Sequence, residues 1–583
     1  MQRRSLNQSI VCDILLHLED DRPNTANAEP FPTMTLSPTT SDSTATPELT
    51  NVATEPKPKR FWFSIFVILV LLTLAGSAQY RDLLNDRSIS NAVSMITVGV
   101  AALVLLSMVF RFVAQRKSWL LAAIVTVGLA LTPFALFRLK GFSGEIIPVL
   151  EFRFRSGAEL QSIVTGSSDT PTPTEVATTS FAQFLGANRD AIIEPREFAV
   201  PNGNEEEMWR TAIGEGWSSF AIQDQYCVTL EQREERECVT CYRLDNGSLL
   251  WIHEETARHE NAIGGIGPRS TPTIVGDMVY AQGATGIVQC LKLATGELIW
   301  KQSLLELAGW PQTESEASIM WGRAASPLLV NNLCIVPFGR PFEAEPTSPL
   351  LDGRSLIAFD ALTGEPKWTA GGDQISFASP VVLQFGETSQ IVSVNEATVT
   401  GHNAVDGKEL WSLPWPGQSN GGANCASVVP AGVDSFLLAK GYGIGCGVFT
   451  VALDGERWTV EEKWKSHRVL KTKFTHACVD GNVAYALSDG TLECVDITDG
   501  NRLWAQSRAT RYGHGQIIRV GDCLVVQAEA GNVAFVAASP DEYKELATMD
   551  ALSSKSWNVP SIAGRYLAVR NDVEAVMYRL PAK

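Results

Sequence analysis

The sequence predicts an all-β globular domain, an eight-bladed β-propeller of four-stranded antiparallel blades, preceded by three transmembrane α-helices and a disordered N-terminal tail. Three observations predict it. A turn motif that ends in Trp recurs at intervals of ~40–50 residues, which is typical of propeller and solenoid arrays. Between its copies, short apolar runs alternate with Gly, Asp and Asn turns, as in antiparallel sheets. Upstream, three uncharged apolar runs are each near the ~20 residues that a helix needs to cross a bilayer.

The turn motif places a Trp four residues after a Gly, and five copies stand at residues 244–251, 293–300, 361–368, 404–411 and 497–504. Their Asn-Gly, Asp-Gly and Thr-Gly steps supply the positive backbone torsions that tight hairpins need. A Trp at a fixed place in each blade would bury ~200 Å² between neighbouring sheets. We therefore interpret these Trp side chains as structural, in preference to an aromatic ligand cage.

Units of four short strands begin near eight positions: Trp217, Ser270, Ala325, Phe377, Ala423, Phe474, Gly515 and Trp557. In the fifth unit Trp464 fits the spacing better than Trp458, and the seventh unit has no Trp. The eighth ends before an outermost strand, and Met208–Ile213, just upstream of the first unit, looks like that strand. We predict that this N-terminal strand completes the last blade and closes the ring, leaving no open edge.

The N-terminal third predicts a membrane anchor. Residues 1–57, rich in Ser, Thr and Pro, predict a disordered cytoplasmic tail. Residues 58–140 predict a membrane domain with helices at about 61–78, 92–110 and 119–137, because Lys and Arg flank these uncharged runs; buried core helices are the alternative. Cleavage of the first helix near Ala78 would leave two spans in place.

The distribution of Lys and Arg in the short flanking segments predicts the orientation of these helices. It places the tail in the cytoplasm and everything after Lys140 on the periplasmic side of the inner membrane. Residues 141–206 are interpreted as a tether and cap segment, with a Pro/Thr-rich stretch, and residues 207–583 as the propeller.

Composition and motifs exclude several function classes. The net charge of -17 disfavours nucleic acid as a partner. Cys238 and Cys241 form a C-x-x-C, but residues three apart on a strand point to opposite faces and are poorly placed to hold one metal ion. No zinc-protease, P-loop or nucleophile-elbow pattern occurs in a suitable context. We therefore nominate no catalytic residue and no metal site.

One chemical signal is independent of the repeats. Residues that lead into the innermost strands should ring the mouth of the central channel, and cations and aromatics gather among them: Arg269, Trp321, Arg323, Lys473, His514, Lys555 and Trp557. Converging cations would focus the potential onto an anionic ligand, and aromatics could stack on a planar one. We predict an anion-binding funnel for a planar carboxylate, an acidic peptide or a sugar acid. The alternative is that these cations pair with neighbouring Asp and Glu or face water.

The repeat, a Gly turn followed by a strand that ends in Trp, resembles the pyrroloquinoline-quinone (PQQ) repeat family from about Trp209 to Leu580. The layout of anchor, Pro/Thr tether, Phe-x-Gln-Phe-x-Gly segment (residues 181–186) and propeller is similar to uncharacterised PQQ-like proteins of planctomycete type. No Trp-Asp strand end and no Gly-Gly doublet recurs, as the WD and kelch families would require.

Two kinds of relative bear on function. Quinoprotein alcohol dehydrogenases bind PQQ and calcium in the funnel and clamp PQQ with adjacent cysteines, but this sequence has no Cys-Cys pair. The assembly lipoprotein BamB has similar blades and is a scaffold without a cofactor. The resemblance therefore implies a non-catalytic binding or assembly scaffold for an envelope protein or peptide. The alternative is a membrane-bound, PQQ-dependent oxidoreductase acting on alcohols or sugars.

Overall fold

The computed structural model describes residues 135–153, 159–162, 175–342, 345–346, 348–418 and 421–583, together with positions 100, 104, 107, 127, 128 and 131. The predicted tail and first transmembrane helix lie outside the described residues, as do most of the second and third. No helix among the residues that are described has both the length and the apolar character needed to cross a membrane. The third predicted helix was drawn to residue 137, where the structure begins a strand.

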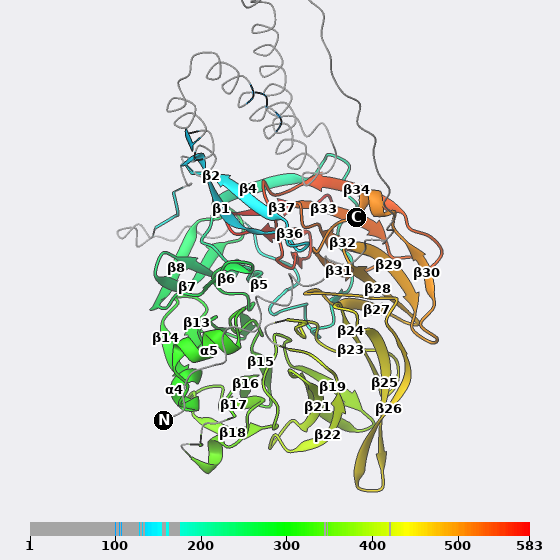
Figure 1. Cartoon of the computed structure of the whole chain (residues 1–583). Coiled ribbons are helices and arrows are strands. Elements are labelled where there is room, and N and C mark those ends of the chain that lie inside the picture. Colours follow the sequence, from blue (N-terminus) through cyan, green and yellow to red (C-terminus); the bar gives the residue numbers. More distant parts are fainter. Residues whose placement is uncertain are drawn as a thin grey trace, which may run out of the picture. The chain divides into compact units, whose positions relative to one another are not determined.

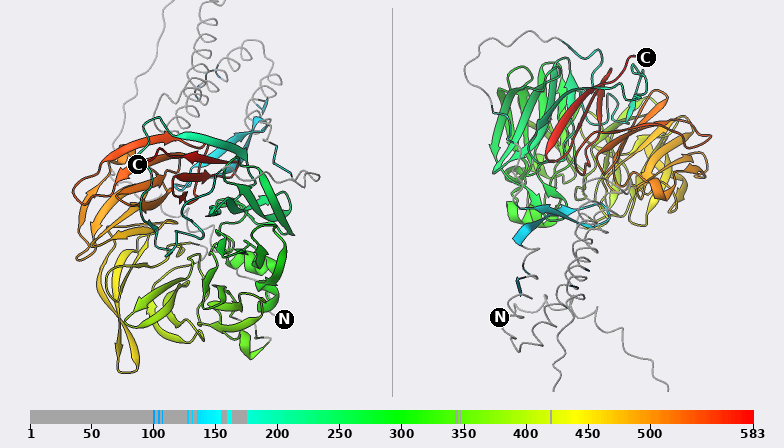
Figure 2. Two further views of the ribbon diagram at one scale, coloured as in Figure 1. Left: turned by 180° about the vertical axis from the view of Figure 1, so that it is seen from behind. Right: turned by 90° about the horizontal axis from the view of Figure 1, so that it is seen from above.

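Eight antiparallel sheets follow one another around a ring, and we number them as blades 1 to 8 (Figures 1 and 2). Blades 1 to 4 consist of β5 (Ala221–Gln223), β6 (Tyr226–Arg233), β7 (Arg236–Arg243), β8 (Leu249–Thr256); β11 (Thr273–Val275), β12 (Met278–Gln282), β13 (Ile287–Lys292), β14 (Leu298–Ser303); β15 (Leu328–Val330), β16 (Leu333–Pro337), β17 (Leu356–Asp360), β18 (Pro366–Ala370); and β19 (Val381–Phe385), β20 (Thr388–Val394), β21 (Thr398–Asn403), β22 (Glu409–Pro414).

Blades 5 to 8 consist of β23 (Val429–Pro430), β24 (Ser435–Lys440), β25 (Gly445–Asp454), β26 (Arg457–Ser466); β27 (Ala477–Asp480), β28 (Val483–Ser488), β29 (Thr491–Asp496), β30 (Arg502–Ala505); β31 (Gln516–Val520), β32 (Cys523–Gln527), β33 (Asn532–Ala537), β34 (Glu545–Asp550); and β35 (Ser561–Ala563), β36 (Tyr566–Arg570), β37 (Glu574–Arg579), β4 (Glu206–Ala212). The eight-bladed, four-stranded architecture is therefore confirmed. Helices α4 (Leu304–Ala308) and α5 (Gln312–Ser318) lie in the connection between blades 2 and 3.

The predicted closure of the ring is also confirmed. Strand β4 pairs antiparallel with β37, with Trp209 opposite Met577. The first strand of the ring along the chain is thus the outermost strand of the last blade. Because the pairing joins the two ends of the propeller segment, the sheet of blade 8 is complete without any further chain.

The Gly turn of the following blade is the packing site of five Trp side chains: Trp209, Trp251, Trp300, Trp368 and Trp464. The Trp209 indole N–H donates to the Leu244 carbonyl at 2.8 Å, and Trp251 does the same to Leu293 at 2.8 Å. Gly247 has φ of 68°, and a Cβ there would lie 2.5 Å from the Trp209 ring. Glycine is therefore required both by the backbone conformation and by the approach of the ring.

Blades 5 and 8 depart from this Trp–Gly packing. Blade 5 has a long β25–β26 hairpin, so Trp411 stacks on Phe436 (5.8 Å, 14°) and donates to Gln390 instead. Trp464 donates to Ile497, as its spacing predicts. Blade 8 takes its outermost strand from the N-terminal side and has no Gly turn. Blade 7, whose unit lacks the Trp, is the blade that precedes it.

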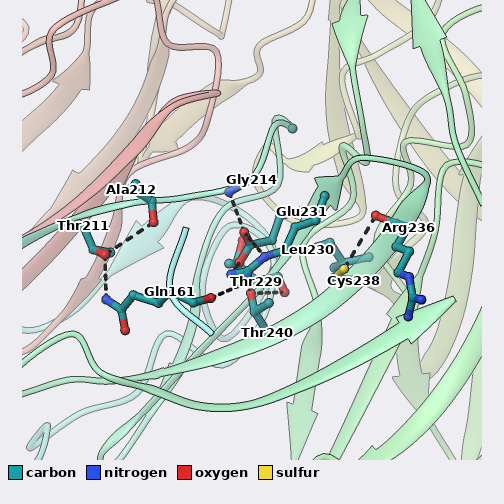
Figure 3. A network of polar contacts seen from close by, with 12 residues as sticks. Gln161, Thr211, Ala212, Gly214, Thr229, Leu230, Glu231, Arg236, Cys238 and Thr240 are labelled. Carbon is teal, nitrogen blue, oxygen red and sulfur yellow. Dashed lines mark hydrogen bonds and ion pairs between the residues drawn. The ribbon is translucent and has the colours of Figure 1, made fainter. Parts of the chain in front are cut away.

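A buried ionic cluster around Glu231 lies at the seam between blades 8 and 1 and reinforces the closure. Figure 3 shows Glu231 beside the Gly214 N–H. Glu231 is fully buried and accepts from the Gly214 N–H at 2.5 Å and the Tyr242 hydroxyl at 2.6 Å. Burial alone would raise the pKa of Glu231, but Arg233 and Arg570 hold the pKa below its usual value. Arg570, on β36, donates to the Leu230 carbonyl of blade 1 at 2.8 Å.

Two segments that precede the ring in the chain lie on its two opposite faces. We call the face at which each innermost strand begins the funnel face. Strands β1 (Phe137–Phe142) and β2 (Pro148–Phe152) form a hairpin on that face, shown in cyan in Figure 2. Strand β3 (Ile192–Ile193) pairs in parallel with β31 at residues 519–520, the other end of an innermost strand. The chain before the ring therefore contacts both of its faces.

Candidate functional site

The tip of the β1–β2 hairpin, Ser143 to Ile147, lies among the residues predicted to form the funnel. The Gly144 N–H donates to Glu529 Oε1 at 2.6 Å, and Lys473 Nζ donates to the Gly144 carbonyl at 3.1 Å. Lys555 Nζ donates to the Phe142 carbonyl at 2.7 Å. Two of the predicted funnel lysines thus bind backbone carbonyls of the chain itself.

Glu145 supplies a carboxylate to the same place. Its Oε1 lies 3.1 Å from Arg511 Nη1 and 3.2 Å from His514 Nε2. That imidazole nitrogen also lies 3.1 Å from Lys473 Nζ, so it can donate to Glu145 or accept from Lys473, depending on the tautomer. Burial lowers the pKa of His514, and the Lys473 ammonium lowers it further, while Glu529 and Glu145 act in the opposite direction.

The fit at the tip leaves no room for a side chain at position 144. A Cβ built on Gly144 would lie 2.5 Å from His514 Cδ2. His514 is 3 % exposed and Phe474 packs beside its ring, so the imidazole has little freedom to move. The glycine is therefore a requirement of the docked hairpin.

The aromatic residues of the funnel contact one another. The Trp217 and Trp557 ring centroids are 4.9 Å apart, and those of Trp557 and Phe474 are 5.1 Å apart. The Lys555 ammonium lies 3.7 Å from the Trp557 centroid, and burial, the main cause, lowers the pKa of Lys555 to about 8. A planar ligand between two rings needs about 7 Å, twice the ~3.5 Å of one van der Waals contact. These rings have no such slot.

The remaining predicted residues lie beside or apart from this cluster. Arg269 and Trp217 both donate to the Gly264 carbonyl, at 3.0 and 2.7 Å, in the short hairpin of β9 (Glu260–Asn261) and β10 (Gly265–Ile266). Trp321 packs there too, since a Cβ on Gly264 would lie 2.8 Å from its ring. Arg323 is buried, donates to the Phe338 carbonyl at 2.7 Å, and has its pKa lowered to about 10 by burial. The structure thus brings Lys473, His514, Lys555 and Trp557 together around the hairpin.

Two acidic residues of the funnel face were not predicted. Glu529 accepts from Gly144 and, at 3.1 Å, from the Trp557 indole; its other oxygen accepts from the His514 N–H at 2.9 Å. Asp572 pairs with Lys140 of β1 at 3.0 Å. Both follow the second strand of their blades. In an antiparallel blade the turn between the second and third strands lies at the same face as the start of the first, and that geometric rule could have identified them.

The cations of the funnel face are held by contacts within the chain. They contact carboxylates or carbonyls of the chain. No group of three or more His, Cys, Asp or Glu side chains that could hold a metal ion occurs in the part of the chain that the structure describes. Burial raises the pKa of Cys238 to about 12 and that of Cys241 far above its usual value, so both thiols stay protonated.

In comparisons with known proteins, a family model and a sequence relative both carry the description outer membrane protein assembly factor BamB. A protein-family model described as outer membrane protein assembly factor BamB matches residues 199–340 and 235–506. The BamB protein of Bordetella pertussis is 23% identical over 320 residues, which cover 54% of this chain and 73% of that protein.

Solved structures with detectable similarity include two dehydrogenases and a BamB protein. The quinohemoprotein alcohol dehydrogenase of Comamonas testosteroni is 11% identical and is matched over 70% of this chain and 81% of its own (TM-score 0.48). A europium-containing methanol dehydrogenase is 11% identical over 68% and 90% (TM-score 0.49). BamB from Moraxella catarrhalis is 13% identical over 64% and 83% (TM-score 0.31).

Proposed function

Because this chain belongs to the PQQ-like β-propeller family, through a model described as outer membrane protein assembly factor BamB, we propose that it is a membrane-anchored, non-catalytic scaffold. It binds or assembles a protein or peptide partner in the cell envelope. The apolar runs of residues 61–137 hold it in the inner membrane, and the propeller lies on the periplasmic side.

The observation that carries this proposal is the docked hairpin. In a propeller enzyme with its reaction site in the funnel, the substrate must reach the groups that line it. Here Gly144 is hydrogen-bonded on both sides and Glu145 lies against His514 and Arg511. The predicted recognition of a carboxylate by this funnel is used within the chain, by Glu145.

The residues present do not fit PQQ held as in the quinoprotein dehydrogenases. The sequence has no adjacent cysteines to clamp it. The Trp217 and Trp557 rings contact each other, and Lys555 covers one face of Trp557. We therefore derive no redox step for this chain.

The partner site is proposed on the outer rim of the ring. Strands β25 and β26 have ten residues each and extend beyond the other blades (Figure 1), with Leu453 54% exposed near their tip. A projecting hairpin with β26 as an outer edge strand suits a protein partner, whereas a small molecule would need a cavity.

The test uses the purified full-length chain. PQQ with calcium should give no thermal shift and no dye reduction with alcohols or sugars. A photo-crosslinking residue at position 453 should yield an adduct with a defined envelope protein in cells. Calcium-dependent dye reduction on adding PQQ would overturn the proposal in favour of the oxidoreductase.

A further inference from the structure

The β1–β2 hairpin has an outward face that is unusually apolar. Five large apolar side chains in this short element are exposed: Phe137 (41%), Leu139 (51%), Ile146 (66%), Ile147 (46%) and Leu150 (47%). Leu139 and Leu150 face each other across the two strands. Exposed apolar residues of the blades are scattered through several hundred residues, which is ordinary for a protein surface. The hairpin concentrates them in one patch.

The polar groups of the hairpin explain which side it turns to the ring. Lys140 pairs with Asp572, Gly144 bonds to Glu529 and Lys473, and Glu145 meets Arg511 and His514. The contacts with the propeller are therefore made through backbone and charged groups. The large apolar side chains remain on the exposed surface, so the docking does not account for them.

The position of the hairpin in the chain indicates what covers this patch. Residues 119–137 form an uncharged apolar run, and its last residue, Phe137, is the first residue of β1. A run that crosses a bilayer delivers the next residues to the membrane surface. Strand β1 begins at the last residue of this run, so under the proposed anchoring the hairpin lies at the membrane surface.

The charges at the base of the hairpin fit the same surface. Arg138 is 63% exposed while it pairs with Glu151 Oε2 at 2.7 Å, and Arg153, after β2, donates to the Phe137 carbonyl at 3.1 Å. Arginine side chains next to apolar and aromatic groups are typical of the membrane–water interface, where the guanidinium reaches lipid phosphates.

We propose that the apolar face of the β1–β2 hairpin lies in the interfacial layer of the bilayer and turns the funnel face of the ring towards the membrane. This inference rests on the proposed membrane anchoring. It deepens the proposed function, because the opposite face and the rim, with the β25–β26 hairpin, are then the surfaces open to a periplasmic partner.

The test places a photo-crosslinking phenylalanine analogue in the full-length chain, in native membranes, at Ile147 or Leu150. Val433 is the matched control, since it is 86% exposed and lies in the turn after β23, at the opposite face. We expect lipid adducts at positions 147 and 150 and none at 433. Alkaline extraction is measured in parallel and should leave the chain in the membrane.

The outcomes separate the two proposals. If the chain stays in the membrane but positions 147 and 150 give a protein adduct or no lipid adduct, the interfacial hairpin is wrong and the anchoring stands. If alkali releases the chain, the anchoring is wrong and the inference falls with it. Equal lipid labelling at Val433 would also contradict a defined orientation of the ring.

Discussion

The Glu145 carboxylate lies 3.2 Å from the His514 imidazole, although 369 residues separate the two in the chain. The contact joins a hairpin that precedes the propeller to the seventh blade. It places an acidic group of the chain inside the funnel that its own sequence predicts for an anion. The behaviour of this contact, and of the closure that makes the ring, gives the following predictions.

Substitution of Gly144 by Ala should release the hairpin without unfolding the ring. The new Cβ would lie 2.5 Å from buried His514, a contact that cannot relax easily. We expect faster hydrogen–deuterium exchange at residues 137–152, with the exchange of the blade strands unchanged. Gly372→Ala, where a Cβ meets nothing within 4 Å, is the control and should leave the hairpin protected. Equal protection in both variants would contradict the docking.

The Trp–Gly packing at the seam can be measured with a matched pair of glycines. Gly247 and Gly276 have φ of 68° and 62°, but only at Gly247 would a Cβ meet a Trp ring. Gly276→Ala should cost about 1 kcal/mol of unfolding free energy through backbone strain. Gly247→Ala should cost roughly 1–3 kcal/mol more through overpacking. Denaturant titration of both variants measures the difference, and equal losses would show that Trp209 does not pack there.

Removal of Arg570 should leave Glu231 with an incompletely compensated buried charge. Arg570→Met also leaves the Gly214 and Leu230 carbonyls without this donor. We expect a loss of roughly 3–5 kcal/mol, as for other broken buried ion pairs. Lys292→Met removes an exposed pair with Glu297 (44% and 59% exposed) and should cost at most about 1 kcal/mol. Similar losses for the two variants would argue against a role of the seam cluster.

Three buried histidines should each destabilise the folded chain as the pH falls below neutral. Burial, the main cause, lowers the pKa of His259, His402 and His476 to about 4, against about 6.5 in an unfolded chain. Between these values the unfolded state binds more protons, so the unfolding free energy decreases as pH falls, by up to ~1.4 kcal/mol per pH unit for each histidine. His476→Gln can still donate to the Ile517 carbonyl and should flatten the slope between pH 7 and 5. His467→Gln, at an exposed position, should not.

The ring was predictable because its long-range packing leaves a local sequence signature. A Trp four residues after a Gly reports that one blade packs on the next, and the missing outer strand of the last unit reports the closure. The fold is therefore predictable from short repeated segments, each of which can be recognised without knowing its spatial neighbours.

The occupant of the funnel was not predictable in the same way. Residues 137–152 alternate as a hairpin should, but next to an apolar run and a Pro/Thr-rich stretch they were interpreted as helix end and tether. No local sequence pattern indicates that Glu145 contacts Arg511 and His514, which lie 366 and 369 positions further along the chain. The segments that lead into the innermost strands do not include Glu529 and Asp572. These two residues lie in the turns between second and third strands, which share the funnel face.

Disulfide trapping tests the central claim, that the chain closes its own funnel, most directly. A Cβ on Gly144 would lie 2.5 Å from His514 Cδ2 and 2.7 Å from His514 Cβ. Because His514→Cys removes the imidazole that blocks position 144, the tip can then shift to the ~3.5–4.5 Å between Cβ atoms that a disulfide needs. The double variant Gly144→Cys with His514→Cys, in the full-length chain under mild oxidation, should form an intramolecular disulfide in the folded protein. The pair Gly372→Cys with His514→Cys should not. Two free, alkylatable thiols at positions 144 and 514 in the folded chain would contradict the account.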